Sequence, residues 1–162
     1  MTQIRGADAT SVATWVVKAV SSAEGTKASP TQDARARQVG SARAGAAEAW
    51  LVKDGKVTEG SSSNAWIVDD KGQLITHPLG EEILGGITRQ TAIACAESLQ
   101  MKVVERAFSV EEALKAREAF ITSAMNLVTP VIAIDGKKIG GGAPGPVAAR
   151  LRAAYVERCG AM

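Results

Sequence analysis

The sequence predicts an α+β fold, in which hairpins of antiparallel strands form a sheet and helices pack against it. Two Asp-Gly pairs, at 54–55 and 135–136, each lie between short apolar runs and so predict tight β-turns. Three other segments, at 88–101, 109–119 and 144–159, carry helical spacing of apolar residues or a helix start signal.

The composition indicates a single globular domain. With 162 residues, of which 46% are apolar and 22% charged, the chain is long enough to bury one sizeable core. A formal charge of +2 gives no reason to expect a nucleic-acid partner. The start of the chain holds charged side chains and no continuous apolar block, so neither a signal peptide nor a membrane span is expected. We therefore expect a cytoplasmic protein.

Residues 1–47 differ in composition from the rest of the chain. No leucine precedes Leu51, whereas eight occur from there on, and thirteen alanines lie in the first fifty positions. The stretch 21–30 is typical of a loop, and 32–47 predicts at most a weak helix of Ala and Arg with little apolar face. We expect an atypical segment at 1–47, disordered or aberrant, and a folded domain at 48–162.

From Glu48 onward, short strands and turns alternate. The predicted strands 48–52 and 64–68 follow each other through the turn KDGK, and the turn DDKG then leads from the second strand into QLITH. Both turns predict hairpins.

The second half alternates helices with extended segments. The first predicted helix places Ala92, Ala96 and Leu99 on one face. After an extended run at 102–108, Ser109 followed three residues later by Glu112 forms a capping-box pattern. Two β-rich runs, EAFITSA and LVTPVIAID, then precede a last helix with an apolar stripe made by Val147, Leu151 and Tyr155.

The cysteines and the histidine carry no recognisable chemistry. Cys95 and Cys159 lie singly in Ala-rich helical patterns, without a CxxC pair or a histidine at ligand spacing, so we expect reduced packing residues and no metal site. His77 stands next to a proline, and a structural role in a loop is favoured over catalysis.

Three polar links connect the predicted elements. The link 60–63 follows Glu59 and consists of one glycine and three serines. The link 85–88, Gly-Gly-Ile-Thr, precedes a predicted helix, whose free N–H groups and dipole attract anions such as phosphate. The link 122–126 adds two hydroxyls and an amide at a strand end. Each link alone is typical of an ordinary turn, but three in one small domain suggest one shared ligand.

The order of these motifs resembles that of the class IV, or fold-type IV, pyridoxal-phosphate-dependent aminotransferases. The segments VTEGSSSNAWIV, ITHPLGEEILGGITR, EAFITSA and VTPVIAIDGKKIGGGAPGP are collinear with the family pattern, from Gly45 to about Cys159. The resemblance implies pyridoxal 5′-phosphate as cofactor and the cofactor-binding, C-terminal domain of that fold.

The cofactor-binding residues that the resemblance implies are Glu59, Ser62, Ser63, Asn64, Leu84, Gly86, Ile87, Thr88, Ser123 and Ala124. In the family, the carboxylate at the position of Glu59 pairs with the pyridine nitrogen and keeps the ring protonated, so that the ring can accept electrons. Residues 62–64 match the polar link along the ring, and 86–88 match the phosphate-binding helix start. Leu84 matches the residue under the ring. Ala124 departs from the pattern, because a hydroxyl often stands there.

The catalytic residue implied by the resemblance is a lysine roughly thirty residues before Glu59, whose amine binds the cofactor and moves a proton. The residue at the matching distance is Lys27. Its neighbours depart from the family pattern, because no Asp-Ile pair and no apolar strand surround it. Lys18 has strand-like neighbours but lies too far from Glu59.

The resemblance implies reversible transamination between an amino acid and a 2-oxo acid, in a homodimer. The three consecutive serines favour D-amino acids, such as D-alanine, although branched-chain aminotransferases and aminodeoxychorismate lyase are also similar. The family's N-terminal domain, which supplies part of the substrate site and of the dimer, is expected to be missing. Two alternatives therefore stand beside an active enzyme: a fragment, and a non-catalytic remnant that binds pyridoxal phosphate.

Overall fold

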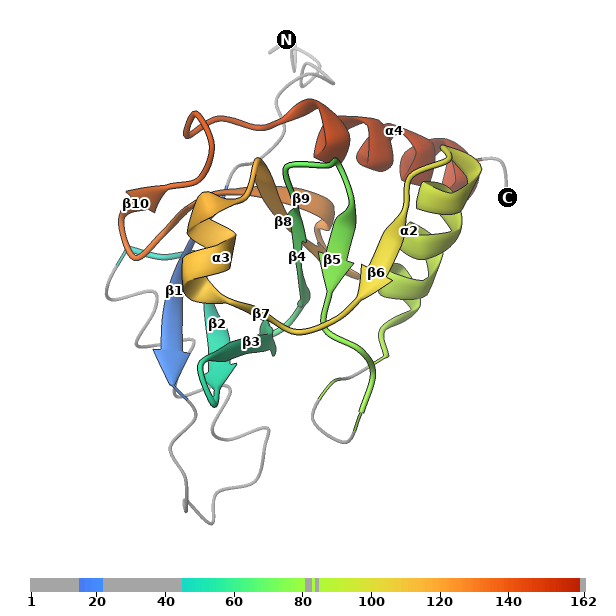
Figure 1. Ribbon diagram of the computed structural model, residues 1–162. Coiled ribbons are helices and arrows are strands. Elements are labelled where there is room, and N and C mark those ends of the chain that lie inside the picture. The colour runs from blue at the N-terminus through green and yellow to red at the C-terminus, as the bar shows by residue number, and fades with distance from the viewer. Residues whose placement is uncertain (1–14, 22–44, 81–82, 84, 161–162) are drawn as a thin grey trace, which may run out of the picture.

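The computed structural model describes residues 15–21, 45–80, 83 and 85–160, and it confirms an α+β fold built on one mixed sheet (Figure 1). The strands are β1 (Trp15–Ser21), β2 (Glu48–Lys53), β3 (Lys56–Gly60), β4 (Asn64–Val68), β5 (Leu74–Thr76), β6 (Val103–Glu105), β7 (Phe108–Ser109), β8 (Glu118–Ser123), β9 (Leu127–Ile134) and β10 (Lys137–Lys138). Their order in the sheet is β6-β5-β4-β8-β9-β1-β2-β3-β7, with β10 paired to β9.

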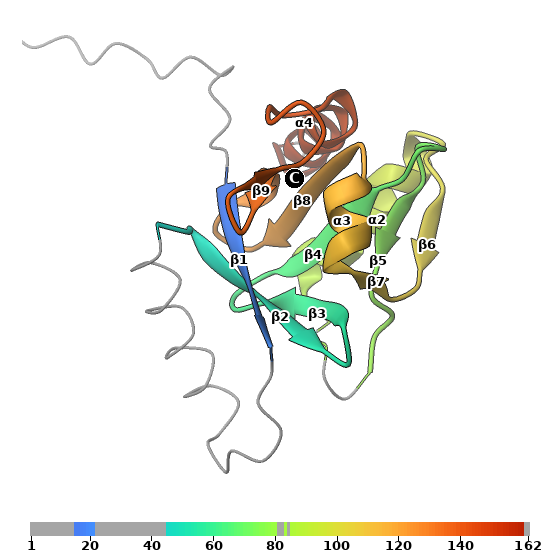
Figure 2. The same cartoon turned by 60° about the vertical axis from the view of Figure 1, so that its left-hand side comes forward.

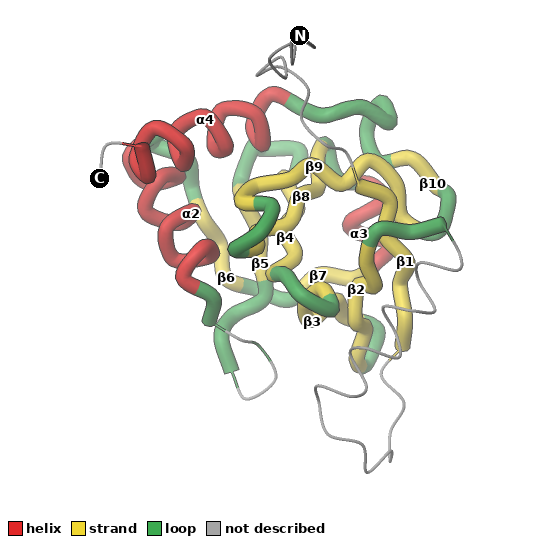
Figure 3. Tube along the Cα trace, turned by 180° about the vertical axis from the view of Figure 1, so that it is seen from behind, coloured by secondary structure: helices red, strands yellow, loops and turns green. Residues whose placement is uncertain are grey.

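Two short connections force this sheet to curl. Strands β3 and β4 are joined by residues 61–63 alone, although β8, β9, β1 and β2 lie between them in the sheet. In a flat sheet, five strand spacings would separate β3 from β4 by about 24 Å, and four Cα steps reach only about 15 Å. Strands β6 and β7, at opposite ends of the order, are likewise joined by residues 106–107. The sheet therefore forms a half-barrel, and its curvature is visible in Figures 2 and 3.

The predicted Asp-Gly turns are confirmed. Asp54 and Gly55 have φ values of 50° and 74°, and Asp135 and Gly136 have 50° and 75°, in the left-handed region that a two-residue hairpin of this type requires. The first pair joins β2 to β3, and the second joins β9 to β10. The turn between β4 and β5 is held by the Asp69 carboxylate, which accepts hydrogen bonds from the N–H groups of residues 71 and 73.

Strand β1 was not predicted. It lies within the compositionally unusual segment 1–47, for which the sequence showed no sustained period. The structure inserts it between β2 and β9, parallel to both. Residues 1–14 and 22–44 lie outside the described part of the chain, so the predicted loop at 21–30 and the weak helix at 32–47 stay predictions for those positions.

The helices follow the sequence signals closely. They are α2 (Ile87–Ser98), α3 (Val110–Lys115) and α4 (Pro146–Gly160). Half of the predicted capping box forms, because Ser109 Oγ accepts a hydrogen bond from the N–H of Glu112. The Glu112 side chain instead pairs with Arg106. On α4, Leu151 and Tyr155 are buried as predicted, whereas Val147 is only half-buried.

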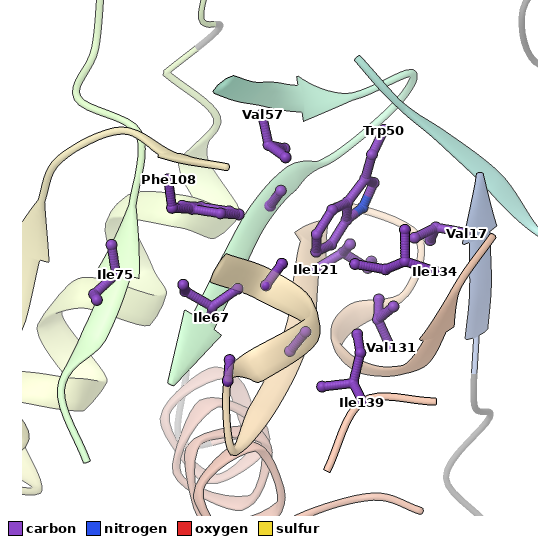
Figure 4. Packing of buried hydrophobic residues seen from close by; sticks show 14 residues of the cluster. Val17, Trp50, Val57, Ile67, Ile75, Phe108, Ile121, Val131, Ile134 and Ile139 are labelled. Atoms are coloured by element: carbon purple, nitrogen blue, oxygen red, sulfur yellow. The ribbon is translucent and has the colours of Figure 1, made fainter. Parts of the chain in front are cut away.

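The strands separate two hydrophobic cores. An inner core lies on the α3 side of the sheet, and Figure 4 shows its side chains pointing toward one another from strands far apart in the sequence. An outer core lies between the sheet and the pair α2 and α4. Strand β4 contributes to both by alternation: Ala65 and Ile67 face the inner core, and Trp66 and Val68 the outer. Trp66 stacks on Phe120 with 5.4 Å between ring centroids.

The two cysteines differ in environment. Cys95 is buried in the outer core, as predicted, but Cys159 is exposed on α4, so its predicted packing role is wrong. Both cysteines are free. Within the described ranges, no helix is both long and apolar enough to cross a membrane.

Helix α4 begins on a buried carboxylate. Glu118, at the start of β8, is 8% exposed, and its two oxygens accept hydrogen bonds from the N–H groups of Val147 (3.0 Å) and Ala148 (2.9 Å). A negative charge there also interacts favourably with the helix dipole. A Cβ on Gly145 would overlap the Glu118 carboxyl group, so only glycine leaves room for this contact.

We expect Glu118→Ala to lower the free energy of unfolding by about 2 kcal/mol, because two N–H groups of α4 lose a charged partner. Urea denaturation followed by circular dichroism measures this change. Glu157→Ala, on the exposed side of the same helix, serves as the control and should change stability by less than about 0.5 kcal/mol. Equal stability of the two variants would contradict the capping role.

Candidate functional site

The three polar links predicted from the sequence meet in one pocket. It has a volume of about 340 Å³ and opens where β3 and β8 end and β4 begins, near the start of α2. The described residues that line it are Glu59, Gly60, Ser61, Ser62, Ser63, Asn64, Gly86, Ile87, Thr88, Thr122, Ser123 and Ala124. Residues as far apart in the sequence as Glu59 and Ala124 thus face one space.

Nine of the ten cofactor-binding residues expected from the sequence line this pocket; their individual roles stay predictions. The tenth, Leu84, and the expected catalytic residue Lys27 lie outside the described part of the chain. Asn126 does not line the pocket; its N–H group instead donates a hydrogen bond to Ser123 Oγ. His77 also lies outside the lining, and its Nδ1 contacts the carbonyl of Pro78 at 2.8 Å.

The start of α2 provides hydrogen-bond donors. Gly86 is the N-cap in an extended conformation and has no side chain to cap the helix, and the backbone N–H groups of the first turn have no partner within the helix itself. The helix dipole adds positive potential there. A Cβ on Gly86 would lie 3.3 Å from Asn64 Oδ1, so the backbone comes close to β4 at this point. Thr88, in the first turn, is buried and adds a hydroxyl.

The end of β8 provides two further hydroxyls. Thr122 Oγ1 accepts a hydrogen bond from Trp66 Nε1 at 3.0 Å, and Ser123 Oγ accepts one from Asn126 N at 3.2 Å. Because each oxygen accepts a hydrogen bond from the protein, each hydroxyl can donate its own hydrogen toward a ligand. The α2 end of the pocket therefore favours an anion.

Arg89, in the first turn of α2, is 2% exposed and anchors that turn to the sheet. Its Nη2 contacts Glu105 on β6 at 2.5 Å, and its guanidinium lies 5.9 Å from the centre of the Trp66 ring. The paired charge fixes the helix start relative to the sheet.

The wall formed by residues 61–63 is held by a buried carboxylate that the sequence did not predict. Glu48, the first residue of β2, is fully buried and accepts hydrogen bonds from the N–H and hydroxyl of Ser62 (2.7 and 3.1 Å) and from the hydroxyl of Ser63 (2.6 Å). Burial raises the pKa of the Glu48 carboxyl, and the hydrogen bonds from the serines oppose that rise. The available signal was an acidic residue opening an otherwise apolar strand.

Glu59, the last residue before Gly60, is half-buried and is the acidic side chain among the described lining residues. The pocket thus has hydrogen-bond donors at the α2 end and a carboxylate at the β3 end. Such a pocket suits a ligand that carries an anionic group at one end and a protonated group at the other.

The described lining contains no lysine. Among the described ranges, no cluster of three His, Cys, Asp or Glu side chains could hold a metal ion.

Comparison with known proteins gives a consistent family. The sequence profile of the family "Amino-transferase class IV" matches residues 13–134. D-alanine aminotransferase of Bacillus licheniformis is 43% identical over 111 residues, which are 68% of this chain and 39% of that protein. The branched-chain-amino-acid aminotransferase of Pseudomonas aeruginosa is 40% identical over 114 residues, which are 70% of this chain and 36% of that protein.

A solved structure shares the fold. The branched-chain amino acid aminotransferase of Thermobaculum terrenum in its PLP (pyridoxal phosphate) form superimposes with a TM-score of 0.79 and 29% identity, over 91% of this chain and 51% of that one. The chain thus spans less than half the length of these curated relatives and about half of this solved neighbour.

The raised pKa of Glu48 predicts a pH-dependent loss of stability. The folded state holds this proton more tightly than the unfolded state, so the wild type should lose stability as the pH rises from the ordinary glutamate value through the raised one. Glu48→Gln cannot titrate and should lack this loss. Denaturation of both proteins at several pH values between about 4 and about 8 measures the difference in slope. Parallel stability curves would contradict the raised pKa.

Proposed function

The chain belongs to the class IV aminotransferases, and from this we propose that its pocket binds pyridoxal 5′-phosphate and serves transamination between an amino acid and a 2-oxo acid. The observation that carries the proposal is that Glu59 and the start of α2 line the same pocket. Family members use this cofactor, and the Thermobaculum terrenum neighbour is solved with it.

The α2 end of the pocket fits the phosphate group. Its donors are the backbone N–H groups at the start of the helix and the hydroxyls of Thr88, Thr122 and Ser123. Together with the helix dipole they can neutralise an anion without a lysine or arginine in the described lining. The close approach of Gly86 to Asn64 leaves little room for a side chain between the helix start and β4.

The Glu59 end fits the protonated ring nitrogen. When bound, pyridoxal phosphate supplies an electron sink for the electrons released as the Cα–H bond of the substrate breaks. The part played by Glu59 is to hold a proton at the ring nitrogen through a charge-assisted hydrogen bond.

Lys27 stays the proposed catalytic amine, which would carry a proton to and from the substrate's α-carbon. The lack of a lysine among the described lining residues agrees with an amine supplied from outside the described ranges. The same observation favours a second candidate function, a non-catalytic protein that binds pyridoxal phosphate reversibly.

Among possible substrates, D-amino acids such as D-alanine are favoured over branched-chain L-amino acids. The proposal rests on the three serines at 61–63 and on the similarity to D-alanine aminotransferase of Bacillus licheniformis. A homodimer is proposed from the family alone.

We expect Thr88→Val and Glu59→Gln each to weaken pyridoxal phosphate binding by about tenfold or more, because the first removes a hydrogen bond to the phosphate and the second removes the negative charge beside the protonated ring nitrogen. Absorbance titration with pyridoxal phosphate measures the dissociation constants. Ser98→Ala, at the other end of α2, is the matched control and should bind like the wild type. If the wild type binds no pyridoxal phosphate, the proposed function is wrong.

Lys27→Ala separates the two candidate functions. In an enzyme that uses Lys27, the substitution should lower the rate of pyruvate formation from D-alanine and a 2-oxo acid by a factor of at least about 10³, since no other residue replaces the amine. Reversible pyridoxal phosphate binding should persist. A wild type that binds the cofactor but forms no product with either D-alanine or branched-chain amino acids would favour the non-catalytic protein instead. Full activity of Lys27→Ala would exclude Lys27 as the amine.

A further inference from the structure

Glu48 is a fully buried carboxylate that no part of the proposed reaction uses. It lies on β2, while the residues it contacts lie on the link between β3 and β4 (61–63). Its Oε1 accepts two hydrogen bonds from Ser62, and its Oε2 accepts one from Ser63. The hydroxyl of Ser61 also interacts with this carboxyl group. Donors from one short link thus converge on a single buried carboxylate, and they hold that link in a single arrangement.

These contacts determine what the link offers to a ligand. The N–H groups of Gly60, Ser61 and Ser62 donate to the Ser63 carbonyl, the Ala49 carbonyl and the Glu48 carboxylate respectively. The hydroxyl hydrogens of Ser62 and Ser63 are also directed to Glu48. Toward the pocket, these two hydroxyls can therefore act only as hydrogen-bond acceptors.

Gly60 is part of the same arrangement. A Cβ at this position would overlap Ser63 Oγ and come within 2.6 Å of Glu48 Oε2. No side chain fits between the carboxylate and the link, so the Glu-Gly-Ser-Ser-Ser sequence and the distant Glu48 are matched in shape as well as in hydrogen bonding.

We propose that Glu48 is a positioning residue that turns the hydroxyls of Ser62 and Ser63 into acceptors toward the pocket and thereby fixes which way the ligand lies there. The inference rests on the proposed binding of pyridoxal phosphate. The link offers acceptors, whereas α2 and β8 offer donors. An anionic group of the ligand is therefore excluded from the link and accepted at α2 and β8. Glu48 thus acts through Ser62 and Ser63 without touching the ligand.

A role in stability alone makes a different prediction. If Glu48 only held the fold together, its substitution would weaken every ligand of the pocket to the same extent. A positioning role affects a ligand that spans both walls and spares one that uses only the donor wall. Pyridoxal phosphate and inorganic phosphate are two such probes.

The test is Glu48→Gln, in which the amide donates a hydrogen bond that the carboxylate accepted and so frees a serine hydrogen. We expect the affinity for pyridoxal phosphate to fall about tenfold, while inorganic phosphate, measured as a competitor, keeps its inhibition constant within about twofold. The N–H group of Ser62 should exchange its hydrogen about tenfold faster, since its charged acceptor is lost.

Glu118→Gln is the matched control. Glu118 is also a buried carboxylate that accepts two backbone N–H hydrogen bonds. It lies at the first residue of β8, whereas Ser123, at the pocket, is the last. The Glu118→Gln substitution should lower the stability of the fold without changing the ratio between the affinities for pyridoxal phosphate and for inorganic phosphate. Equal weakening of both ligands by Glu48→Gln, or no weakening of either, would overturn the proposal.

The proposed function can fail separately. If the wild type binds no pyridoxal phosphate, that function is wrong, and hydrogen exchange then decides the role of Glu48 by itself. Faster exchange of Ser62 in Glu48→Gln, with unchanged exchange at Val147 and Ala148, would support an anchored link. Unchanged exchange of Ser62 would overturn it.

Discussion

The three-residue link at 61–63 is the constraint on which the rest of the structure depends. It joins strands that four others separate in the sheet, and this is possible only because the sheet curls. The curl brings the end of β3 to the start of β4 and, with it, the end of β8 and the start of α2. Glu48 holds the link from a third strand, so the contacts that close the half-barrel also position one wall of the pocket. The pocket is therefore a product of topology, and its walls come from segments that have no contact in an extended chain.

Much of the fold was predictable where the cause is local. The turns at Asp54-Gly55 and Asp135-Gly136 need residues that tolerate positive φ, and the start of α3 needs a short polar side chain at Ser109. Residues that lie next to one another in the sequence meet these requirements, so the sequence alone can predict them. Strand β1 was missed because its partners, β2 and β9, lie far along the chain and pair with it in parallel. Its short run of valines inside an Ala-rich and Ser-rich segment offers no periodicity that would indicate a strand without them.

The site shows the same division. The three polar links could be found from the sequence, because glycines and hydroxyls gather before a helix or at a strand end, and the order of the motifs joined them to one family. The sequence could not show how the links share their hydrogen bonds. Ser62 and Ser63 were expected along the ligand, and they do line the pocket, but their hydroxyl hydrogens are directed to Glu48. A partner fourteen or fifteen residues away, on another strand, leaves no local pattern.

The separation of the two cores by a single sheet has a consequence for how this protein can change. Side chains of the outer core, between the sheet and helices α2 and α4, are divided from the inner core by the backbones of β4 and β8. Volume changes around Leu151 or Tyr155 can be absorbed by a shift of α4, whereas the inner core has strands on several sides and little freedom to adjust. Laboratory evolution or redesign would find its tolerant positions on α4, which contributes no residue to the described lining of the pocket, and it could improve expression or heat resistance there while the pocket keeps its geometry.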